Sequence, residues 1–412
     1  MTSLSTKLAQ LEAFGKPIQV GIIGAGKFGS MYISQAHLTK GVRLAAIADL
    51  SRERALASLK RTGFPEDKYD VSLSLREGLE AGKTAITTDS AELIAQPGID
   101  VILEVTGSPA AGVRHVLLCC EHKKHIVMVN VEADVLAGPL LARKAQEAGI
   151  IYSMAYGDQP ALIAEMVDWA RAAGFNVVCA GKGTKHLPEY HYSTPDTVWS
   201  HYGFTDEQLA SGDFNKQMFN SFLDGTKSAL EMSAVANGCG LRPPNGLKFP
   251  PCGTHDLPQV LKPKSEGGQM ESYGTVEVVS CLETDGRWVH NDLRWGVYVV
   301  IEAKRDLMVG EKLDGEGGFM VYGKIMSAEN SLEIEGLPIG LAHGLILKRA
   351  VRKDQGLSWQ DVEWSVESQA VAVRREMEDV YRKEFAGRVN GKADSKVDSK
   401  LVDGASVVVN GH

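Results

Sequence analysis

The chain of 412 residues lacks a long hydrophobic run, since no apolar stretch approaches the roughly eighteen residues that a membrane-spanning helix needs. Residues 1–16 also lack the apolar core of a secretory signal. Leu4, Leu8, Leu11 and Phe14 recur there at helical spacing instead, which predicts a short amphipathic helix. We therefore expect a cytoplasmic protein with no membrane partner.

The chain has few cysteines, and they form neither a C-x-x-C pair nor a compact framework. Scattered cysteines of this kind are typical of reduced thiols in a cytosolic protein. The six are Cys119, Cys120, Cys179, Cys239, Cys252 and Cys281.

An excess of positive charge is also missing. The net charge of −8 argues against general nucleic-acid binding, and no basic stripe with interleaved aromatic side chains offsets it. The hydrophobic fraction of 44% and the charged fraction of 23% are those of a globular protein. The length predicts two or three domains of about 100 to 200 residues each.

A glycine motif between two strand patterns is the most informative feature. The hydrophobic residues 18–23 predict a buried strand, and a G-x-G-x-x-G pattern follows at once. Its first glycine makes a tight turn, its second lets the backbone approach a pyrophosphate, and its third packs a helix closely on the strand. The phosphates then lie on the helix N-terminus. The expected cofactor-binding residues of this motif are Gly24, Gly26, Lys27, Phe28 and Gly29.

Asp49 ends the second predicted strand, residues 43–48, twenty residues after Gly29. A carboxylate there accepts hydrogen bonds from a ribose diol, which favours NAD over NADP. Three residues close behind it, Ser51, Arg52 and Arg54, could still accommodate a 2′-phosphate. The pattern therefore predicts NAD or NADP as cofactor.

Further strand and helix patterns alternate up to residue 155. Strands are expected at 84–88, 100–105, 125–130 and 150–155, with helices at 110–123 and 136–148 among them. This alternation predicts an α/β fold, a Rossmann-type doubly wound parallel sheet with helices on both faces. Thr106 and Gly107 follow a strand's carboxyl end, where the cofactor crevice lies in such sheets, so we expect both to contact the dinucleotide.

Polar residues follow another strand of this sheet. Asn130 can hydrogen-bond a nicotinamide or a substrate carbonyl, and Glu132 is a candidate for substrate binding. The alternative is that Glu132 and Asp134 are only acids that favour the start of the next helix.

Two lysines lie on a predicted glycine-rich loop that follows a strand at 176–180. Lys182 and Lys185 could bind an anion there, or the loop could be an ordinary solvated one. The aromatic and histidine-rich residues 187–203 predict a long functional or mobile loop. No carboxylate is paired with His186, His191 or His201 at helical spacing, so no metal is predicted there.

A second informative element is the helix predicted over residues 218–238. Asp224, Lys227 and Glu231 lie within roughly 60° of one another around its axis. They form either an exposed charged stripe or a buried active-site face. A lysine between carboxylates keeps a proton available for transfer to a carbonyl oxygen.

Several long motifs together resemble the deoxyxylulose-phosphate reductoisomerase-like proteins, relatives of homoserine dehydrogenase that carry a C-terminal SAF-type domain. The similarity covers nearly all of residues 4–385. The motifs are Val129-Asn130-Val131-Glu132-Ala133-Asp134, Ala155-Tyr156-Gly157-Asp158-Gln159-Pro160, Gly181-Lys182-Gly183-Thr184-Lys185, Ser193-Thr194-Pro195-Asp196-Thr197-Val198-Trp199, Ser221-Phe222-Leu223-Asp224-Gly225-Thr226-Lys227 and Leu337-Pro338-Ile339-Gly340-Leu341-Ala342-His343-Gly344.

The resemblance implies an NAD(P)-dependent oxidoreductase in which Asp224 and Lys227 look like the proton-transfer pair of homoserine dehydrogenases. Glu231 and Lys182 complete the expected catalytic set, and Lys185 would hold the charge of a small anionic substrate. In one departure from the family, residues 301–303 run straight into Lys304-Arg305, where relatives have a longer segment.

Two alternatives stay open beside this homoserine dehydrogenase-like activity. One is a metal-assisted reductoisomerase of a ketose phosphate, with Glu132, Asp134 or Glu231 as ligands of Mg²⁺ or Mn²⁺. A divalent metal is compatible with the sequence but is not required by it. The other alternative is a nucleotide-binding protein that no longer catalyses.

The pattern and the resemblance together predict four parts. They are a dinucleotide-binding domain at 1–155, an α+β substrate domain at 156–303, a small β-rich SAF-like domain with its closing helix at 304–386, and a disordered tail at 387–412. Residues 272–282 and 288–303 are expected to pair as a hairpin, whose sheet could build a homo-oligomer interface.

Overall fold

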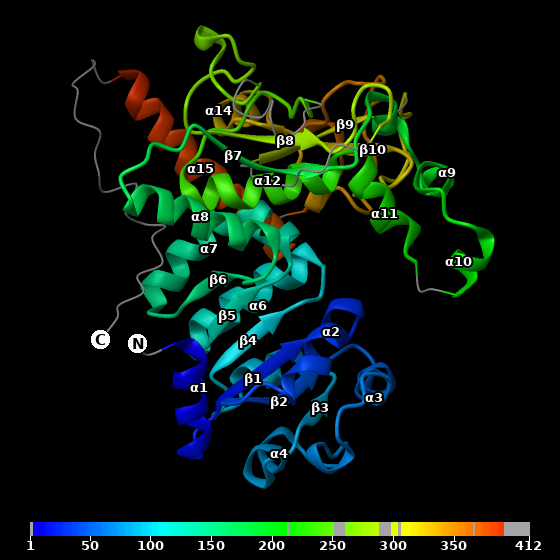
Figure 1. The fold of residues 1–412 in the computed structure, drawn as a ribbon. Helices are drawn as coiled ribbons and strands as arrows, with labels where there is room; N and C mark the ends of the chain where they lie inside the picture. Colours follow the sequence, from blue (N-terminus) through cyan, green and yellow to red (C-terminus); the bar gives the residue numbers. More distant parts are fainter. Residues whose placement is uncertain are drawn as a thin grey trace. The chain divides into compact units, whose positions relative to one another are not determined.

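The computed structural model describes residues 3–211, 214–250, 260–287, 298–303, 306–365 and 367–390. The chain folds into two compact units (Figure 1). The first unit holds Met1–Asp134 and Leu140–Ala155, and the second holds Val135–Pro139 and the residues from Tyr156 onward. The predicted SAF-like residues share the second unit with the predicted substrate domain, and the division into four parts stays a prediction.

A six-stranded parallel sheet forms the centre of the first unit. Its strand order is β3-β2-β1-β4-β5-β6, so the order reverses between β1 and β4. The predicted doubly wound Rossmann-type sheet is confirmed. The strands are β1 (Ile18–Ile23), β2 (Val42–Ala48), β3 (Ala85–Thr87), β4 (Val101–Glu104), β5 (His125–Met128) and β6 (Tyr152–Met154).

Helices connect these strands, and apolar side chains fill the space between helices and sheet. Ile22, Ile33, Ile47 and Leu59 are all fully buried in one core cluster, and burying each such side chain contributes about 1.5–3 kcal/mol. The helices are α1 (Leu4–Ala13), α2 (Lys27–Ala36), α3 (Arg52–Arg61), η1 (Glu66–Lys68), α4 (Leu75–Ala81), α5 (Ser90–Ala95), α6 (Pro109–His122) and α7 (Val131–Ala148).

Two helices of this unit differ from the sequence-based expectation. Helix α4 lies before β3, where the sequence pattern predicted no helix, and it begins at a capping box of Ser74 and Glu77. Helix α7 begins five residues before the expected start, because Asn130 caps its first turn by accepting a hydrogen bond from the Ala133 N–H.

The second unit is built around α12 and two short sheets. Its helices are α8 (Gln159–Ala172), η2 (Pro188–Tyr192), α9 (Val198–Tyr202), α10 (Asp206–Ser211), α11 (Lys216–Leu223), α12 (Thr226–Cys239), η3 (Lys264–Glu266), α14 (Ala328–Glu333), η4 (Ile339–Leu341), η5 (Trp359–Asp361) and α15 (Gln369–Asn390). Its strands are β7 (Cys179–Thr184), β8 (Thr275–Ser280), β9 (Tyr298–Ala303) and β10 (Val321–Met326).

The strand pairing in this unit corrects two predictions. The glycine-rich residues 181–183 were expected in a loop but lie within β7, which pairs in parallel with β8. A side chain on Gly181 would meet the carbonyl oxygen of Glu277 at 1.8 Å, so glycine is required for the close approach of the two strands. The expected hairpin between β8 and β9 is also wrong for the described residues, since β9 pairs antiparallel with β10.

The long helix predicted over 218–238 is interrupted. Gly225 has a φ of +86°, which ends α11 and begins α12. Asp224 is the last residue before this break, so it does not share a helix with Lys227 and Glu231. The expected common face of the three side chains is therefore wrong, although Lys227 and Glu231 remain four residues apart on α12.

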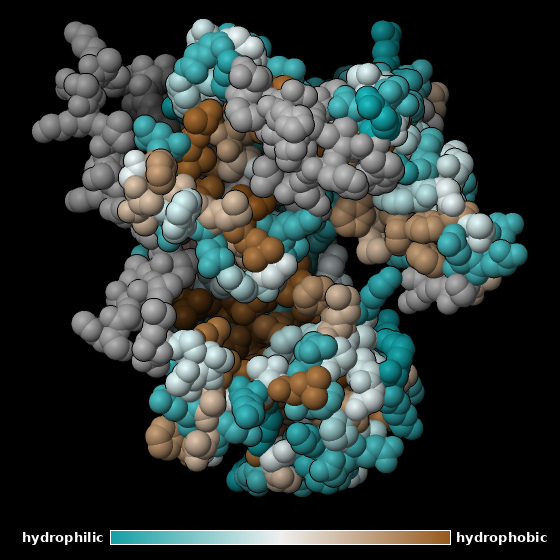
Figure 2. Space-filling model, in the orientation of Figure 1, coloured by the Kyte–Doolittle hydropathy of each residue, from teal (hydrophilic) through white to brown (hydrophobic). Residues whose placement is uncertain are grey.

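Apolar side chains reach the surface in the second unit, where Figure 2 shows tan and brown surface over α8 and β7. On α8 itself, Met166 and Trp169 are largely exposed. In the part of the chain that the structure describes, no helix is both long and apolar enough to cross a membrane. The predicted disordered tail lies outside the described residues except for its first four positions, which end α15.

Candidate functional site

The glycine turn after β1 is shaped as the dinucleotide motif requires. Gly24 has a φ of +112°, and a side chain there would meet the Val105 carbonyl oxygen at 3.0 Å. A side chain on Gly29 would lie 2.2 Å from the Gly24 carbonyl oxygen, so only glycine lets α2 pack this closely on the turn. A side chain on Gly26, by contrast, would meet no atom within 4 Å.

These observations test whether the turn fits a dinucleotide. The open space at Gly26 leaves room for a phosphate, and α2 begins there with no hydrogen bond from a capping side chain. Lys27 and Phe28 are exposed beside it. The residues of the motif therefore fit a pyrophosphate at the N-terminus of α2.

Asp49 has polar partners within the protein. One carboxylate oxygen accepts the Ala25 N–H at 2.8 Å, and the other accepts the Ser51 N–H at 3.0 Å and the Arg54 Nε at 2.7 Å. Burial alone raises the pKa of Asp49, but these hydrogen bonds and the Arg54 charge outweigh it and hold the pKa below its ordinary value. Asp49 is thus an ionised carboxylate whose charge Arg54 offsets.

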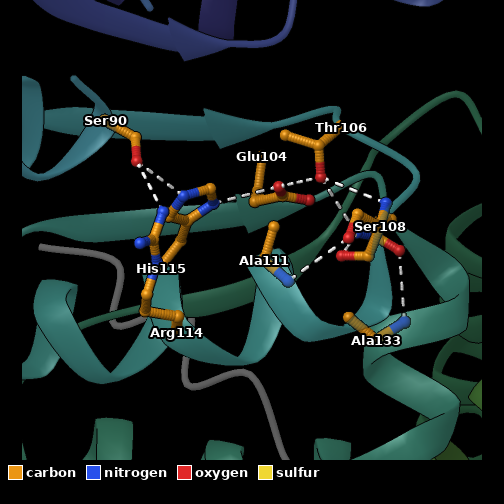
Figure 3. A network of polar contacts seen from close by, with 9 residues as sticks. Ser90, Glu104, Thr106, Ser108, Ala111, Arg114, His115 and Ala133 are labelled. Carbon is orange, nitrogen blue, oxygen red and sulfur yellow. Dashed lines mark hydrogen bonds and ion pairs between the residues drawn. The ribbon is translucent and has the colours of Figure 1, made fainter. Parts of the chain in front are cut away.

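The turn after β4 lies beside the glycine turn, because the Val105 N–H donates to the Ile23 carbonyl at 3.0 Å. Thr106 and Gly107 are exposed there, as expected of residues that contact a cofactor. Figure 3 shows the polar contacts that hold this turn. The Thr106 hydroxyl donates to Glu104 at 2.5 Å, and Asn130 Nδ2 donates to the Ser108 carbonyl at 2.8 Å.

Asn130 therefore joins two elements of the first unit. Its amide nitrogen reaches the turn at residues 106–108, while its oxygen caps α7. Glu132 and Asp134 lie in the first turn of α7, as the helix-start alternative stated. Asp134 accepts the Tyr152 hydroxyl at 2.5 Å, and burial raises the pKa of Asp134 to about 6 despite this hydrogen bond.

A buried charge cluster occupies the second unit. The Lys182 ammonium on β7 lies 3.4 Å from a Glu231 carboxylate oxygen on α12, and their side chains are only 2% and 4% exposed. Burial raises the pKa of Glu231 to about 7, although Lys182 and Lys227 both lower it and Asp158 raises it further. A pKa near 7 suits a carboxyl group for proton transfer at neutral pH.

Lys227 lies one turn before Glu231 and is half-buried. The exposed-stripe alternative is wrong for Asp224 and Glu231, which are 2% and 3% exposed. Asp224 accepts the Thr226 N–H at 2.9 Å, so it fixes the first residue of α12 just before Lys227. The four predicted catalytic residues thus lie on β7, α12 and the break before it.

Lys185 does not join this cluster. Its ammonium donates to the His201 carbonyl and lies 5.2 Å from the centre of the Tyr202 ring. Burial lowers the pKa of Lys185. The two lysines expected to share one anion-binding loop therefore have different surroundings, since Lys182 lies within β7 and Lys185 follows its last residue.

The histidines of residues 186–201 make aromatic contacts. His186 stacks on Phe249 with ring centres 4.0 Å apart, and burial lowers the pKa of His186 to about 4. His191 and His201 pack against Tyr322 and Tyr190. Within the described ranges, no group of three His, Cys, Asp or Glu side chains is placed to hold a metal ion.

Two family models match the chain and adjoin one another. Residues 20–153 match the homoserine dehydrogenase NAD-binding domain. Residues 157–315 match the catalytic domain of oxidoreductase DRL. These two matches agree with the predicted NAD(P)-binding domain and with the predicted oxidoreductase class of the part that follows it.

Individual relatives are more distant. Homoserine dehydrogenase of Pseudomonas aeruginosa is 29% identical over 136 residues, which are 33% of this chain and 28% of that protein. The chain therefore spans little more than a quarter of the length of this curated relative.

Solved structures show weak similarity. A myo-inositol dehydrogenase from Lactobacillus casei, in complex with NAD(H) and myo-inositol, is 16% identical with a TM-score of 0.31, covering 45% of this chain and 52% of that one. An NAD binding oxidoreductase from Klebsiella pneumoniae is 18% identical with a TM-score of 0.30, covering 42% and 44%. Scores this low carry no argument about function.

Sequence reasoning missed a group of buried polar residues. Glu104 and His115 are buried and hydrogen-bonded in the first unit, and Glu277 is buried in the second. Burial raises the pKa of Glu277 to about 7, against hydrogen bonds from the N–H groups of Val278, Lys248 and Phe249. Glu104 and Glu277 each lie in a predicted strand, so a charged residue within an apolar run was the available signal.

Proposed function

We propose that the protein catalyses NAD(P)-dependent hydride transfer between the cofactor and a small anionic hydroxy or carbonyl compound, in the manner of homoserine dehydrogenases. The observation that carries this proposal is the cluster of the buried Lys182 and Glu231 with the half-buried Lys227. A carboxyl group with a pKa of about 7 beside two lysines suits proton transfer at neutral pH. The bound nicotinamide would supply or accept the hydride.

Each residue of the cluster has a distinct role in this proposal. Lys227 donates a proton to the substrate oxygen during reduction and accepts it during oxidation. Glu231 exchanges that proton with Lys227 one helical turn away, and Asp224 holds the start of α12 in place. When Glu231 is protonated, the two lysines give the cluster a net positive charge, which favours an anionic substrate.

The cofactor half of the proposal rests on the glycine turn and its neighbours. Gly24, Gly26 and Gly29 fit the pyrophosphate, and the exposed Thr106 and Gly107 would contact the nicotinamide end. Asn130 would act through the turn that it holds. We also propose that the protein is a homo-oligomer, which light scattering on the purified protein tests.

The direct experiment is an assay of NADH and NADPH oxidation with a panel of small carbonyl acids and carbonyl phosphates. Turnover with at least one anionic carbonyl compound is expected, and it should persist in excess EDTA. Turnover that EDTA abolishes and Mg²⁺ or Mn²⁺ restores would favour the metal-assisted reductoisomerase instead. Cofactor binding without turnover on any panel member would favour a non-catalytic nucleotide-binding protein.

A further inference from the structure

Four side chains from three elements of the first unit form a continuous hydrogen-bonded chain (Figure 3). The Ser90 hydroxyl lies 2.9 Å from His115 Nε2, and His115 Nδ1 lies 3.1 Å from Glu104 Oε1. The same Glu104 oxygen accepts the Thr106 hydroxyl at 2.5 Å. Arg114 also donates to Ser90 at 3.2 Å.

The chemistry of these groups decides which of them donate and which accept along this row of hydrogen bonds. An ionised Glu104 can only accept hydrogen bonds, so Nδ1 of His115 must carry a hydrogen. In the neutral imidazole, Nε2 is then an acceptor, and the Ser90 hydroxyl must donate to it. Donors thus run from Arg114 through Ser90 and His115 toward Glu104, and Thr106 donates to Glu104 from the other side.

The burial of Glu104 is energetically unfavourable. Glu104 is fully buried, and its second carboxylate oxygen has no hydrogen-bond partner among the described residues. Burial removes the carboxylate from water, and both of the hydrogen bonds that it accepts fall on its other oxygen. A buried carboxylate oxygen without a partner is rare in folded proteins and points to a role beyond packing.

These hydrogen bonds hold the exposed turn of residues 106–108 in place. Thr106 Oγ1 accepts the Ser108 N–H at 3.2 Å and Asn130 Nδ2 at 3.4 Å, while its own hydrogen goes to Glu104. The turn follows β4 at the border with β1, where the strand order reverses and a dinucleotide binds in such sheets.

The arrangement of Ser90, His115 and Glu104 also resembles the nucleophile, base and acid of a serine hydrolase. The described residues around Ser90 do not complete a hydrolytic site. Asp89 already accepts the N–H groups of Ala91 and Glu92, at 2.8 and 3.3 Å, which are the nearby donors that could stabilise an oxyanion. A role in positioning accounts for more of these contacts than a role in hydrolysis.

We propose that Glu104 and His115 are positioning residues, which hold the turn of residues 106–108 in the shape that binds the nicotinamide cofactor. This inference rests on the proposed function only in requiring that NAD(P)H binds. The turn is exposed and short. If it is already fixed before binding, less of its conformational entropy is lost when the cofactor binds. Loss of the His115 donor should therefore weaken cofactor binding and not the chemistry of the second unit.

The test is a fluorescence titration of the full chain with NADH and NADPH, without substrate, for His115→Leu and His115→Asn. Leucine removes the donor to Glu104, and we expect the Kd to rise about tenfold. Asparagine places an amide N–H where Nδ1 lies, and we expect the Kd to stay within about twofold of the wild type. Glu104→Gln, which keeps the size but loses the charge, should raise the Kd about fivefold.

The outcomes separate this inference from the proposed function. If all three variants bind the cofactor with the wild-type Kd, the positioning role is overturned, while the proposed oxidoreductase function is unaffected. An asparagine variant as weak as the leucine variant would show that the imidazole acts only by packing, which also overturns it. A leucine variant that does not fold leaves the Glu104→Gln result to decide, and a wild type that binds neither cofactor contradicts the proposed function itself.

Discussion

The ammonium of Lys182 lies 3.4 Å from the carboxylate of Glu231, and protein surrounds both side chains almost completely. The two residues come from β7 and α12, so their contact ties the strand to the helix that carries Lys227. Attraction between buried charges roughly balances the cost of removing them from water. The pair is therefore sensitive to the loss of either partner.

Replacing Lys182 by methionine should destabilise the protein, because the buried Glu231 loses a charge that lowers its pKa. The expected cost is about 3 kcal/mol in the free energy of unfolding at pH 8, measured in urea. The same change at Lys216 is a matched control. Its ion pair with Asp196 is shorter, at 2.7 Å, but both side chains are largely exposed, so the expected cost is below about 1 kcal/mol. Equal costs for the two variants would contradict the account of a buried pair.

The pKa of Glu231 predicts the shape of a pH–rate profile. Because burial raises this pKa from its ordinary value of 4.5 to about 7, the carboxyl group is mainly protonated below pH 7 and ionised above it. Lys227 can accept the substrate's proton only after it has passed its own proton to Glu231, and Glu231 must be ionised to take that proton. The rate of alcohol oxidation should therefore rise with pH through about 7.

In Glu231→Gln this limb of the profile should disappear, and the rate at pH 8 should fall by about 10²-fold or more. Glu165→Gln, on the exposed face of α8, serves as the control and should keep the wild-type profile. A profile that keeps its inflection near pH 7 in the Glu231 variant would assign that titration to another group.

The surroundings of Asp49 bear on the choice between NAD and NADP. Sequence analysis expected Asp49 to favour NAD and left open that Arg54 accommodates a 2′-phosphate. The Arg54 guanidinium lies 2.6 Å from the carboxylate and offsets its charge. We therefore expect Arg54→Ala to raise the Kd for NADPH about tenfold and to change that for NADH less. Arg52→Ala is the control, because the Arg52 side chain donates to the Val71 carbonyl. Calorimetric titration checks both, and an equal loss for the two cofactors would contradict a role in 2′-phosphate binding.

The first unit could be predicted from sequence because its signals are local. Strand, glycine turn and helix follow one another within twenty residues, and a side chain on Gly24 or Gly29 would come too close to a backbone oxygen. The helix α4 was missed even though Ser74 and Glu77 form a readable capping box. Its few apolar residues weakened the periodicity on which the helix assignment depended.

The second unit shows what sequence patterns cannot supply. The apolar spacing continues through Asp224 and Gly225, so periodicity alone predicted a single helix. The glycine-rich sequence of β7 is typical of a loop. At position 181, however, only glycine fits, because the backbone of Glu277 on β8 lies so close to it. The contact at Gly181 joins residues almost a hundred positions apart, and no local pattern records it.

The candidate site likewise has features that the sequence predicts and features that depend on tertiary packing. The type and spacing of Lys227 and Glu231 could be read from the sequence, whereas the pairing of Glu231 with Lys182 depends on how β7 packs on α12. The hydrogen bonds of Glu104 and His115 likewise join a strand to a helix. Sequence analysis therefore found the residues of the charge cluster more readily than it found their partners.

The central claim is that Lys227 transfers the proton that accompanies hydride transfer. The most direct measurement is the turnover of Lys227→Ala on the best carbonyl substrate, paired with a fluorescence titration of its NAD(P)H binding. We predict a loss of kcat of about 10²- to 10⁴-fold with an unchanged Kd for the cofactor. Wild-type turnover in this variant, with the cofactor bound as tightly as before, would contradict the account.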